Sequence, residues 1–314
     1  MVKIRKMKVF EKDFIAENKN GCVLALGNFD GVHKGHKFLL EKAREYARGN
    51  NLDFGVYTFV KHPKLTYGKN HEMLTTLQEK LSILSCLDVD FVYLEEFESV
   101  KDYTPCEFVD MITEKFGAEC TFCGENFAFG KGALGNSDTL LKLMTEKGKN
   151  SVAVKTLKID ASVVSSTEIR RFLHEGDAEG AIKLLGEPYS FVSPIIHGAS
   201  LGKRLGYPTV NQIIPEEKII PAFGVYCSIV LIDGKEYMGV TNIGVKPTVS
   251  GDERQVLSET HIIGFNEDVY GKYAGVCLYK KLRGEKKFKN LSELTDNIAM
   301  CVEKTKEYFK ELKK

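Results

Sequence analysis

The chain has 314 residues, with 44 basic and 43 acidic side chains and a formal net charge of +1. This balance gives no electrostatic drive toward nucleic acid or an anionic membrane, and no apolar run approaches the ~20 residues of a membrane span. The basic N-terminus lacks the apolar core of a signal peptide, so we expect a cytoplasmic protein with no nucleic-acid or membrane partner. At about 150 residues per domain, the length predicts two domains.

Eight cysteines are scattered along the chain. Without an export signal, reduced and mostly buried thiols are expected rather than disulfides. Cys120 and Cys123 form one CxxC pair, but no second pair accompanies them. We therefore favour two structural cysteines in a strand over a redox or zinc site.

The first half alternates apolar strand patterns with helix patterns. The apolar run at 22–26 fits a buried parallel strand, and Thr76 with Glu79 forms a capping box that opens a helix. We predict strands over 22–26, 53–59, 90–97, 119–124 and 151–157, and helices over 37–48, 77–84, 105–116 and after Ser165. Such alternation is typical of an α/β domain with a parallel sheet and helices on both faces.

After about residue 185 the pattern becomes one of short strands. Asp233-Gly234 lies between two apolar runs, which is a strong hairpin signal. Further strands are expected at 190–198, 259–265 and 273–279, and a last helix from the spacing of Leu294, Ile298, Val302, Thr305 and Phe309. This half therefore resembles a small antiparallel β-barrel with a C-terminal helix. We expect domains at 1–186 and 187–314.

The segment GNFDGVHKGH (27–36) follows the first buried strand. Open α/β sheets bind ligands at the carboxyl edge of their strands, where glycines let the backbone approach a ligand and a helix start favours an anion. His33 and His36 could add hydrogen bonds to phosphate oxygens, and a phosphate would bias them toward the protonated form. A zinc site would need a third ligand that no motif supplies. Two exposed loop histidines are the other alternative.

HxGH in this position resembles the signature of the nucleotidylyltransferase superfamily. The longer segment LGNFDGVHKGH resembles the adenylyltransferase half of the bacterial bifunctional riboflavin kinase/FAD synthetases. Four more segments match that family in order, namely 58–63, 74–80, 124–130 and 164–170. Lys61 stands where the family usually has a proline before His62 and Pro63.

The resemblance implies a Rossmann-like nucleotidyltransferase domain that adenylylates FMN and releases pyrophosphate. It implies catalytic roles for His33, His36 and Arg170. ATP would contact Gly27, Asn28, Phe29, Asp30, Gly31, Gly35, Ser165, Ser166 and Thr167. The flavin would contact Phe59, His62, Asn126, Phe127 and Phe129, although each phenylalanine is as readily explained as ordinary core.

The segment GKGALG (130–135) satisfies the dinucleotide-binding pattern GxGxxG. That fingerprint belongs in the first strand-to-helix turn, whereas this copy comes late in the sheet. We interpret it as a mobile loop beside the flavin pocket and not as an NAD site.

The segment 198–212, GASLGKRLGYPTVNQ, resembles the riboflavin kinase motif of the same family. The resemblance implies that Thr209 and Asn211 hold Mg²⁺, with Gly202 and Lys203 near ATP. Alternation in a strand places residues 209 and 211 on the same side. A Pro-Thr turn closing a hairpin is the alternative.

The strand at 258–265 resembles the family's Glu-Thr-His strand, which implies that Glu259 is the general base toward the riboflavin 5′-hydroxyl. Arg283 would contact the flavin or the phosphates.

The resemblance as a whole implies conversion of riboflavin to FMN and of FMN to FAD, with ATP as co-substrate and Mg²⁺ as cofactor. One alternative is an FAD synthetase whose barrel is only a regulatory flavin-binding module; the set Thr209, Asn211 and Glu259 argues against it. A non-catalytic flavin carrier is the other. His33, His36 and Arg170 argue against a carrier, because storage of flavin needs no residues that bind pyrophosphate. Nothing in the sequence specifies an oligomeric state.

Overall fold

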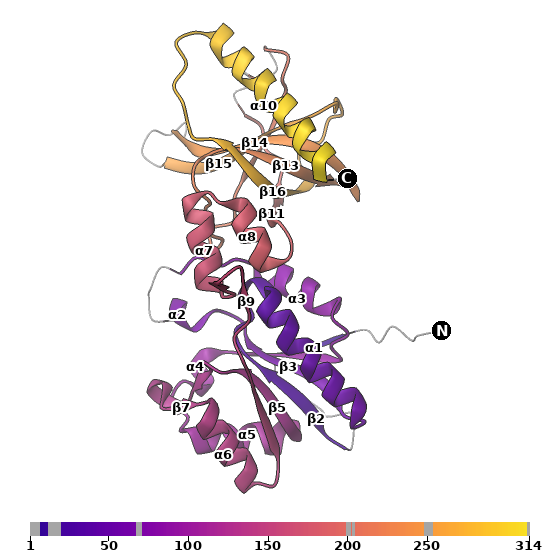
Figure 1. The fold of residues 1–314 in the computed structure, drawn as a ribbon, viewed down its shortest axis with the longest axis vertical. Coiled ribbons are helices and arrows are strands. Elements are labelled where there is room, and N and C mark those ends of the chain that lie inside the picture. The colour runs from indigo at the N-terminus through magenta and orange to yellow at the C-terminus, as the bar shows by residue number, and fades with distance from the viewer. Residues whose placement is uncertain are drawn as a thin grey trace, which may run out of the picture. The chain divides into compact units, whose positions relative to one another are not determined.

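The computed structural model describes residues 7–11, 20–66, 71–198, 202, 205–247 and 254–312 (Figure 1). By its internal contacts the chain divides into a first unit, Met1–Ser166, and a second unit, Thr167–Lys314. Our expected domain boundary at 186/187 lies further along the chain and stays a prediction. No helix in the described part of the chain is long and apolar enough to cross a membrane.

The first unit is built on a six-stranded parallel sheet in the order β1-β4-β3-β2-β5-β8. The chain builds outward from β2 through β3 to β4, and then returns to the other side of β2 with β5 and β8. The carboxyl end of β2 is therefore the topological switch point at which such sheets bind ligands. The strands are β1 (Lys8–Phe10), β2 (Cys22–Leu26), β3 (Asp53–Phe59), β4 (Phe91–Glu95), β5 (Ala118–Gly124) and β8 (Asn150–Val154).

Helices cover both faces of this sheet, as predicted (Figure 1). Val23 and Ala25 of β2 face one core, whereas Cys22, Leu24 and Leu26 face the other, which explains the continuous apolar run. The first core contains residues of α1 (Lys34–Gly49) and α3 (Leu77–Ser85), and the second those of α5 (Pro105–Phe116) and α6 (Ser137–Glu146).

The helices start where the sequence provides caps. Thr76 and Thr104 each form a complete capping box at the starts of α3 and α5, and Gly117 ends α5 in the left-handed conformation. The start of α1 differs from our expectation, because it begins at Lys34 and not at 37. The His33 side chain is its N-cap, so the two histidines belong to the helix start.

Several short elements were not predicted, because two to four residues carry no periodicity. They are η1 (Asp30–Val32), α2 (Pro63–Thr66), α4 (Phe97–Val100), β6 (Ala128–Phe129), η2 (Lys131–Ala133), β7 (Gly135–Asn136), β9 (Lys158–Ile159) and β10 (Ser162–Val163). The GKGALG segment, expected to be a mobile loop, forms η2 between the paired strands β6 and β7.

The CxxC cysteines do not face each other. Cys120 packs in the core under α1, and Cys123 packs in the core on the opposite face. Both thiols are free, and burial raises the pKa of Cys120 to about 11 and that of Cys123 to about 12. These are structural thiols, because an effective nucleophile or metal ligand needs the thiolate.

The second unit contains a six-stranded antiparallel sheet in the order β11-β16-β13-β14-β15-β12. Its two edge strands come together: the Ile196 amide donates to the Asn211 carbonyl at 2.8 Å, and Gln212 Nε2 donates to the Ser193 carbonyl at 2.8 Å. These bonds curl the sheet toward the predicted barrel. The strands are β11 (Tyr189–Pro194), β12 (Thr209–Ile213), β13 (Gly224–Ile232), β14 (Lys235–Pro247), β15 (Arg254–Ile262) and β16 (Tyr273–Arg283).

The described part of the second unit contains the helices α7 (Ser166–Glu175, which starts at the division), α8 (Ala178–Leu185) and α10 (Leu291–Leu312). The predicted C-terminal helix packs Cys301 and Val302 against Val225 and Val240 of the sheet. Asp233-Gly234 forms the hairpin turn between β13 and β14, with both residues at positive φ. The α/β plus antiparallel-barrel architecture is therefore confirmed.

Candidate active sites

The turn after β2 carries the two histidines, and its backbone is strained. Phe29 has φ 50° and Val32 has φ 36°, in the left-handed region that side chains rarely adopt, and Gly31 has φ 79°. A β-branched residue such as Val32 is especially unfavourable there. Such strain persists only where the surrounding structure holds it, and it is common at functional sites.

Asp30 is the first residue that holds this turn. Its buried carboxylate accepts hydrogen bonds from the backbone amides of Leu74, at 3.0 and 3.2 Å, and Thr75, at 3.2 Å. The Gly31 amide donates to Thr75 Oγ1 at 3.1 Å. The matching segments at 27–36 and 74–80 thus form one hydrogen-bonded structure, and Asp30 serves it through backbone contacts.

His33 and His36 stack with ring centroids 3.6 Å apart and an interplanar angle of 14°. His33 Nδ1 accepts the His36 backbone N–H at 3.2 Å. Because Nδ1 is the acceptor, a neutral His33 carries its proton on Nε2, which is the atom able to donate to a phosphate oxygen. A Cβ on Gly35 would lie 3.3 Å from the His33 ring, so glycine keeps the stack close to the backbone.

His36 is poised to accept a partner. Its Nδ1 is buried without a hydrogen-bond partner in the described residues. Burial, with contributions from His33 and Lys80, holds the pKa of His36 well below its usual range. The ring is therefore neutral at pH 7 without ligand, and the protonated form that we expected would require a bound anion.

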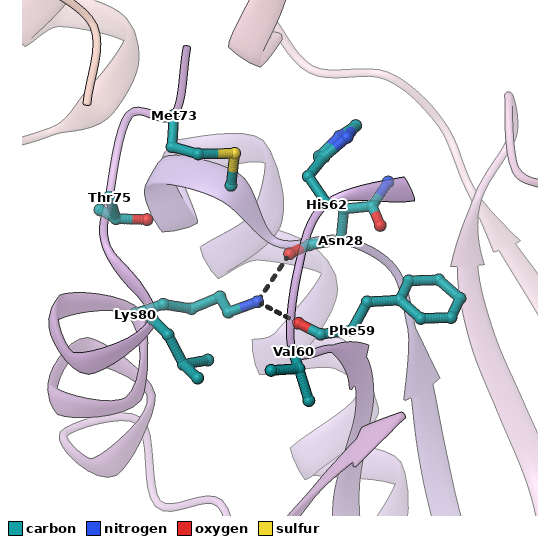
Figure 2. A pocket seen from close by; sticks show the side chains of 8 residues that line it. Asn28, Phe59, Val60, His62, Met73, Thr75 and Lys80 are labelled. Carbon is teal, nitrogen blue, oxygen red and sulfur yellow. Dashed lines mark hydrogen bonds between the residues drawn. The ribbon is translucent and has the colours of Figure 1, made fainter. Parts of the chain in front are cut away.

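A pocket beside the turn joins residues expected to serve both substrates. Asn28 from the β2 turn lies there with Phe59 and His62 from the end of β3 (Figure 2). His62 also contacts the His71 ring, with centroids 4.1 Å apart, and its Nδ1 accepts the Lys64 amide at 3.2 Å. The remaining lining residues are Val60, Met73, Thr75, Leu77 and Lys80.

The other expected flavin residues lie after β5, on the opposite side of β2. Asn126 is exposed and Phe127 is partly buried, stacked on Phe129 at 5.6 Å. Phe129 is 7% exposed and packs on Phe108 in the core. The core alternative therefore describes Phe129 in this structure, whereas Asn126 and Phe127 are accessible to a ligand.

The segment 164–170 spans the division between the two units. Ser165 and Ser166 end the first unit, and within that unit the Ser166 hydroxyl donates to the Asp30 carbonyl of the strained turn at 2.9 Å. Thr167 and Arg170 belong to the second unit, with Thr167 exposed and Arg170 partly buried on α7.

Three of the residues expected for the kinase site lie together in the barrel. In the ladder between β12 and β15, Asn211 lies opposite Glu259 and Thr209 opposite His261. Directly opposite residues, and residues two apart in one strand, point to the same face, so the side chains of Thr209, Asn211 and Glu259 share one face. The metal ligands and the general base implied by the resemblance are therefore neighbours.

Asn211 suits a hard cation. Its side chain is 4% exposed, and Oδ1 has no hydrogen-bond partner in the described residues. A Cβ on Gly198 would lie 2.2 Å from Asn211 Nδ2, so this glycine leaves the room that the amide occupies. No cluster of three His, Cys, Asp or Glu occurs in the described chain. Oxygen ligands from Asn and Thr, with phosphates and water, fit a Mg²⁺-type site.

Gly202 is partly buried, and its carbonyl accepts the amides of Leu205 and Tyr207 at 3.0 and 2.9 Å. Lys203 lies outside the described residues. Arg283 ends β16: its Nη1 donates to the Gly284 carbonyl at 3.0 Å, and its buried Nε has no partner in the described part.

Comparisons with known proteins match both halves of the chain. The family model described as FAD synthetase matches residues 15–168, and that described as riboflavin kinase matches 185–309. The Bifunctional riboflavin kinase/FMN adenylyltransferase of Bacillus subtilis is 33% identical over 96% of each chain. The protein of the same name from Escherichia coli K12 is 34% identical over 93% of this chain and 94% of its own.

The chain belongs to the bifunctional riboflavin kinase/FMN adenylyltransferase family. The resemblance drawn from the ordered motifs is therefore confirmed. A crystal structure described as a macrolide-efflux protein from Streptococcus pneumoniae has the same fold, with a TM-score of 0.86, 27% identity, and coverage of 96% of this chain and 99% of the other.

Sequence reasoning missed Lys80 as a member of the site. It lies between Leu77 and Leu84 on the apolar face of α3 and is 5% exposed. A lysine at an apolar helical position was the available signal, because lysine is almost never fully buried without partners.

Proposed function

We propose that this chain makes FAD from riboflavin in two ATP-dependent steps at two separate sites. The kinase site, in residues 187–314, phosphorylates riboflavin to FMN. The adenylyltransferase site, in residues 1–186, joins FMN to the adenylyl group of ATP and releases pyrophosphate. The observation that carries the proposal is that models of both activities match successive parts of one chain.

In adenylyl transfer, an FMN phosphate oxygen attacks the α-phosphorus of ATP as the bond to pyrophosphate breaks. The nucleophile is already anionic near neutral pH, so the site needs to position two anions and to neutralise charge on the leaving group. His33 Nε2 supports such a role, as does His36 Nδ1, which has no hydrogen-bond partner among the described residues. The resemblance implies the same task for Arg170. The exposed Asn126 and the partly buried Phe127, with Phe59 and His62, would hold the flavin.

In the kinase step, the Glu259 carboxylate takes the proton of the riboflavin 5′-hydroxyl as that oxygen attacks the γ-phosphorus, and ADP leaves. Enzymes of these families use a divalent metal, which neutralises phosphate charge when bound. We assign Mg²⁺ on the grounds of oxygen ligands from Thr209 and Asn211. A cytoplasmic location is part of this proposal and rests on the balanced charge of the chain.

The test is incubation of the full chain with riboflavin, Mg²⁺ and ATP, with products separated by chromatography. FMN should appear first, followed by FAD and pyrophosphate. A barrel that only regulates would give FAD from supplied FMN and nothing from riboflavin. A flavin carrier would give neither product.

A further inference from the structure

Lys80 is a buried lysine whose ammonium group has three protein acceptors. Its Nζ donates to the Phe59 carbonyl at 3.1 Å and to the Asn28 carbonyl at 3.4 Å (Figure 2). It also donates to Thr58 Oγ1 at 3.2 Å. The side chain is only 5% exposed. An ammonium group has three N–H donors and no acceptor, so these three oxygens match it completely.

These contacts connect two separate strand ends. Asn28 lies at the start of the turn that leads to His33 and His36, whereas Thr58 and Phe59 are the last residues of β3. The Thr58 hydroxyl also donates to the Asn28 carbonyl at 3.1 Å. The Asn28 oxygen is therefore held by both the lysine and the threonine.

The turn held in this way is the strained one. Phe29 and Val32 have positive φ, and Asp30 secures the far part of the turn through Leu74 and Thr75. Lys80 secures its near part. Both sets of contacts come from α3 and the residues before it, so α3 supports the strained turn at two points.

We infer that Lys80 is a positioning residue for adenylyl transfer, because its ammonium group fixes the histidine-bearing turn against the end of β3. This inference rests on the proposed adenylyltransferase function. Phe59 and His62, the expected flavin residues, sit at and just after this strand end, so the lysine sets the spacing between the nucleotide side and the flavin side of the pocket.

Direct binding of a substrate phosphate is the competing role for a lysine that lines a pocket. In the structure all three N–H groups are directed to protein oxygens, and binding a phosphate would require one of these bonds to break. The two roles differ kinetically. Loss of a phosphate ligand raises KM, whereas loss of positioning lowers kcat.

The positioning role requires the charged form. A neutral amine has two N–H groups and a lone pair, so one of the three oxygens would face the lone pair. Burial lowers the pKa of Lys80 to about 8, against an opposing effect of Asp30. The other titratable groups around it are His36, whose own pKa is held low, and His33 and His62. Adenylyl transfer should therefore decline above about pH 8.

Unfolding does not account for such a decline. The pKa of Lys80 is lower in the folded chain than its ordinary value of 10.5, so the unfolded chain binds more protons between about 8 and 10.5. The contribution of this group to the free energy of unfolding consequently rises with pH over that interval. Activity and this stability contribution should move in opposite directions.

The first experiment compares Lys80→Met with Lys142→Met, a control at an exposed lysine on α6. Conversion of FMN to FAD should fall roughly 100-fold in kcat at pH 7 for Lys80→Met, with KM for FMN and ATP within about threefold of the parent. Lys142→Met should match the parent. Phosphorylation of riboflavin by the same chain should be unchanged in both variants.

The second experiment measures both activities of the parent chain from pH 6 to 10. FAD formation should fall above about pH 8, while FMN formation, which uses the same ATP and metal, should not follow it. Arginine keeps its charge over this interval. The rate of FAD formation by Lys80→Arg should therefore stay constant to higher pH than in the parent, whatever the absolute rate of the variant.

If Lys80→Met converted FMN to FAD with the kcat of the parent, the inference would be overturned. The same holds if the substitution raised only KM. A decline that is identical in the parent and in Lys80→Arg would overturn it too, and this comparison holds even if Lys80→Met fails to fold. If the parent chain makes no FAD from FMN at any pH, the proposed function itself has failed.

Discussion

Single residues in this protein act by controlling where polar atoms lie. In the first unit, Asp30 and Lys80 hold a strained turn through hydrogen bonds. His33 caps α1 through its Nδ1 atom. In the second unit, a glycine controls the position of a polar group because it has no side chain. Gly198 leaves the space that the Asn211 amide occupies.

Gly198→Ala should therefore weaken the kinase site. The new Cβ would lie 2.2 Å from Asn211 Nδ2 and would displace the amide from the face it shares with Glu259. The Oδ1 of this amide has no hydrogen-bond partner among the described residues. Displacing a supporting contact of a metal ligand typically costs 10–100-fold in metal affinity. We expect the Mg²⁺ concentration for half-maximal FMN formation to rise by about this factor.

Gly275→Ala in β16 is the matched control, since a Cβ there makes only ordinary contacts of 3.6 Å or more. Its metal dependence should equal that of the parent, and FAD formation from FMN should be unaffected in both variants. An unchanged Mg²⁺ requirement in Gly198→Ala would contradict the assignment of Asn211 as a ligand.

At the scale of elements, the fit between neighbouring strands positions the first site. Gly55 of β3 lies opposite Phe91 of β4, and a Cβ on Gly55 would lie 2.1 Å from the Phe91 ring. The aromatic ring thus occupies the space that a side chain on β3 would need. This packing holds β3, whose last residues accept the hydrogen bonds of Lys80.

Gly55→Ala should destabilise the first unit by about 1–3 kcal/mol, the usual cost of overfilling a packed core. Hydrogen exchange of the β3 and β4 amides measures this loss within the first unit. Gly49→Ala, where a Cβ meets nothing within 4 Å, should leave exchange unchanged. Adding Phe91→Leu to Gly55→Ala should restore part of the loss; equal exchange in the single and double variants would exclude the ring as its cause.

At the scale of the whole molecule, two units with different sheets carry two sites built from different residues. The turn at the end of β2 belongs to the first unit, and the pairing of Asn211 with Glu259 belongs to the second. Family models of two activities match the corresponding parts of the chain. The two activities should therefore be separable by single substitutions.

Glu259→Gln should abolish most FMN formation from riboflavin, because an amide cannot accept the hydroxyl proton. It should leave FMN-to-FAD conversion intact. His36→Ala should do the reverse, because it removes an imidazole that we propose neutralises charge on the pyrophosphate leaving group. Separate assays with riboflavin and with FMN test both statements, and a folded variant that lost both activities would refute the separation of the sites.

The sequence by itself determined the two-part architecture, most of the principal elements and the family, although it did not indicate the helices α6 and α8. These follow from local patterns: the apolar run of β2, the capping boxes of α3 and α5, the Asp-Gly hairpin, and motifs whose residues lie close together in the chain. Local chemistry determines such features, so a short stretch is sufficient to identify them.

Only the tertiary structure decided how distant segments share a site. It placed Lys80 against Asn28 and Phe59, and it paired Asn211 with Glu259. It also put Phe129 in the core and separated the CxxC thiols to opposite faces of the sheet. The physical reason is that burial and hydrogen-bond partners arise from strand order and register between segments far apart in the chain. The sequence therefore does not distinguish a solvent-exposed lysine of a helix from one that supports the strained turn of a candidate active site.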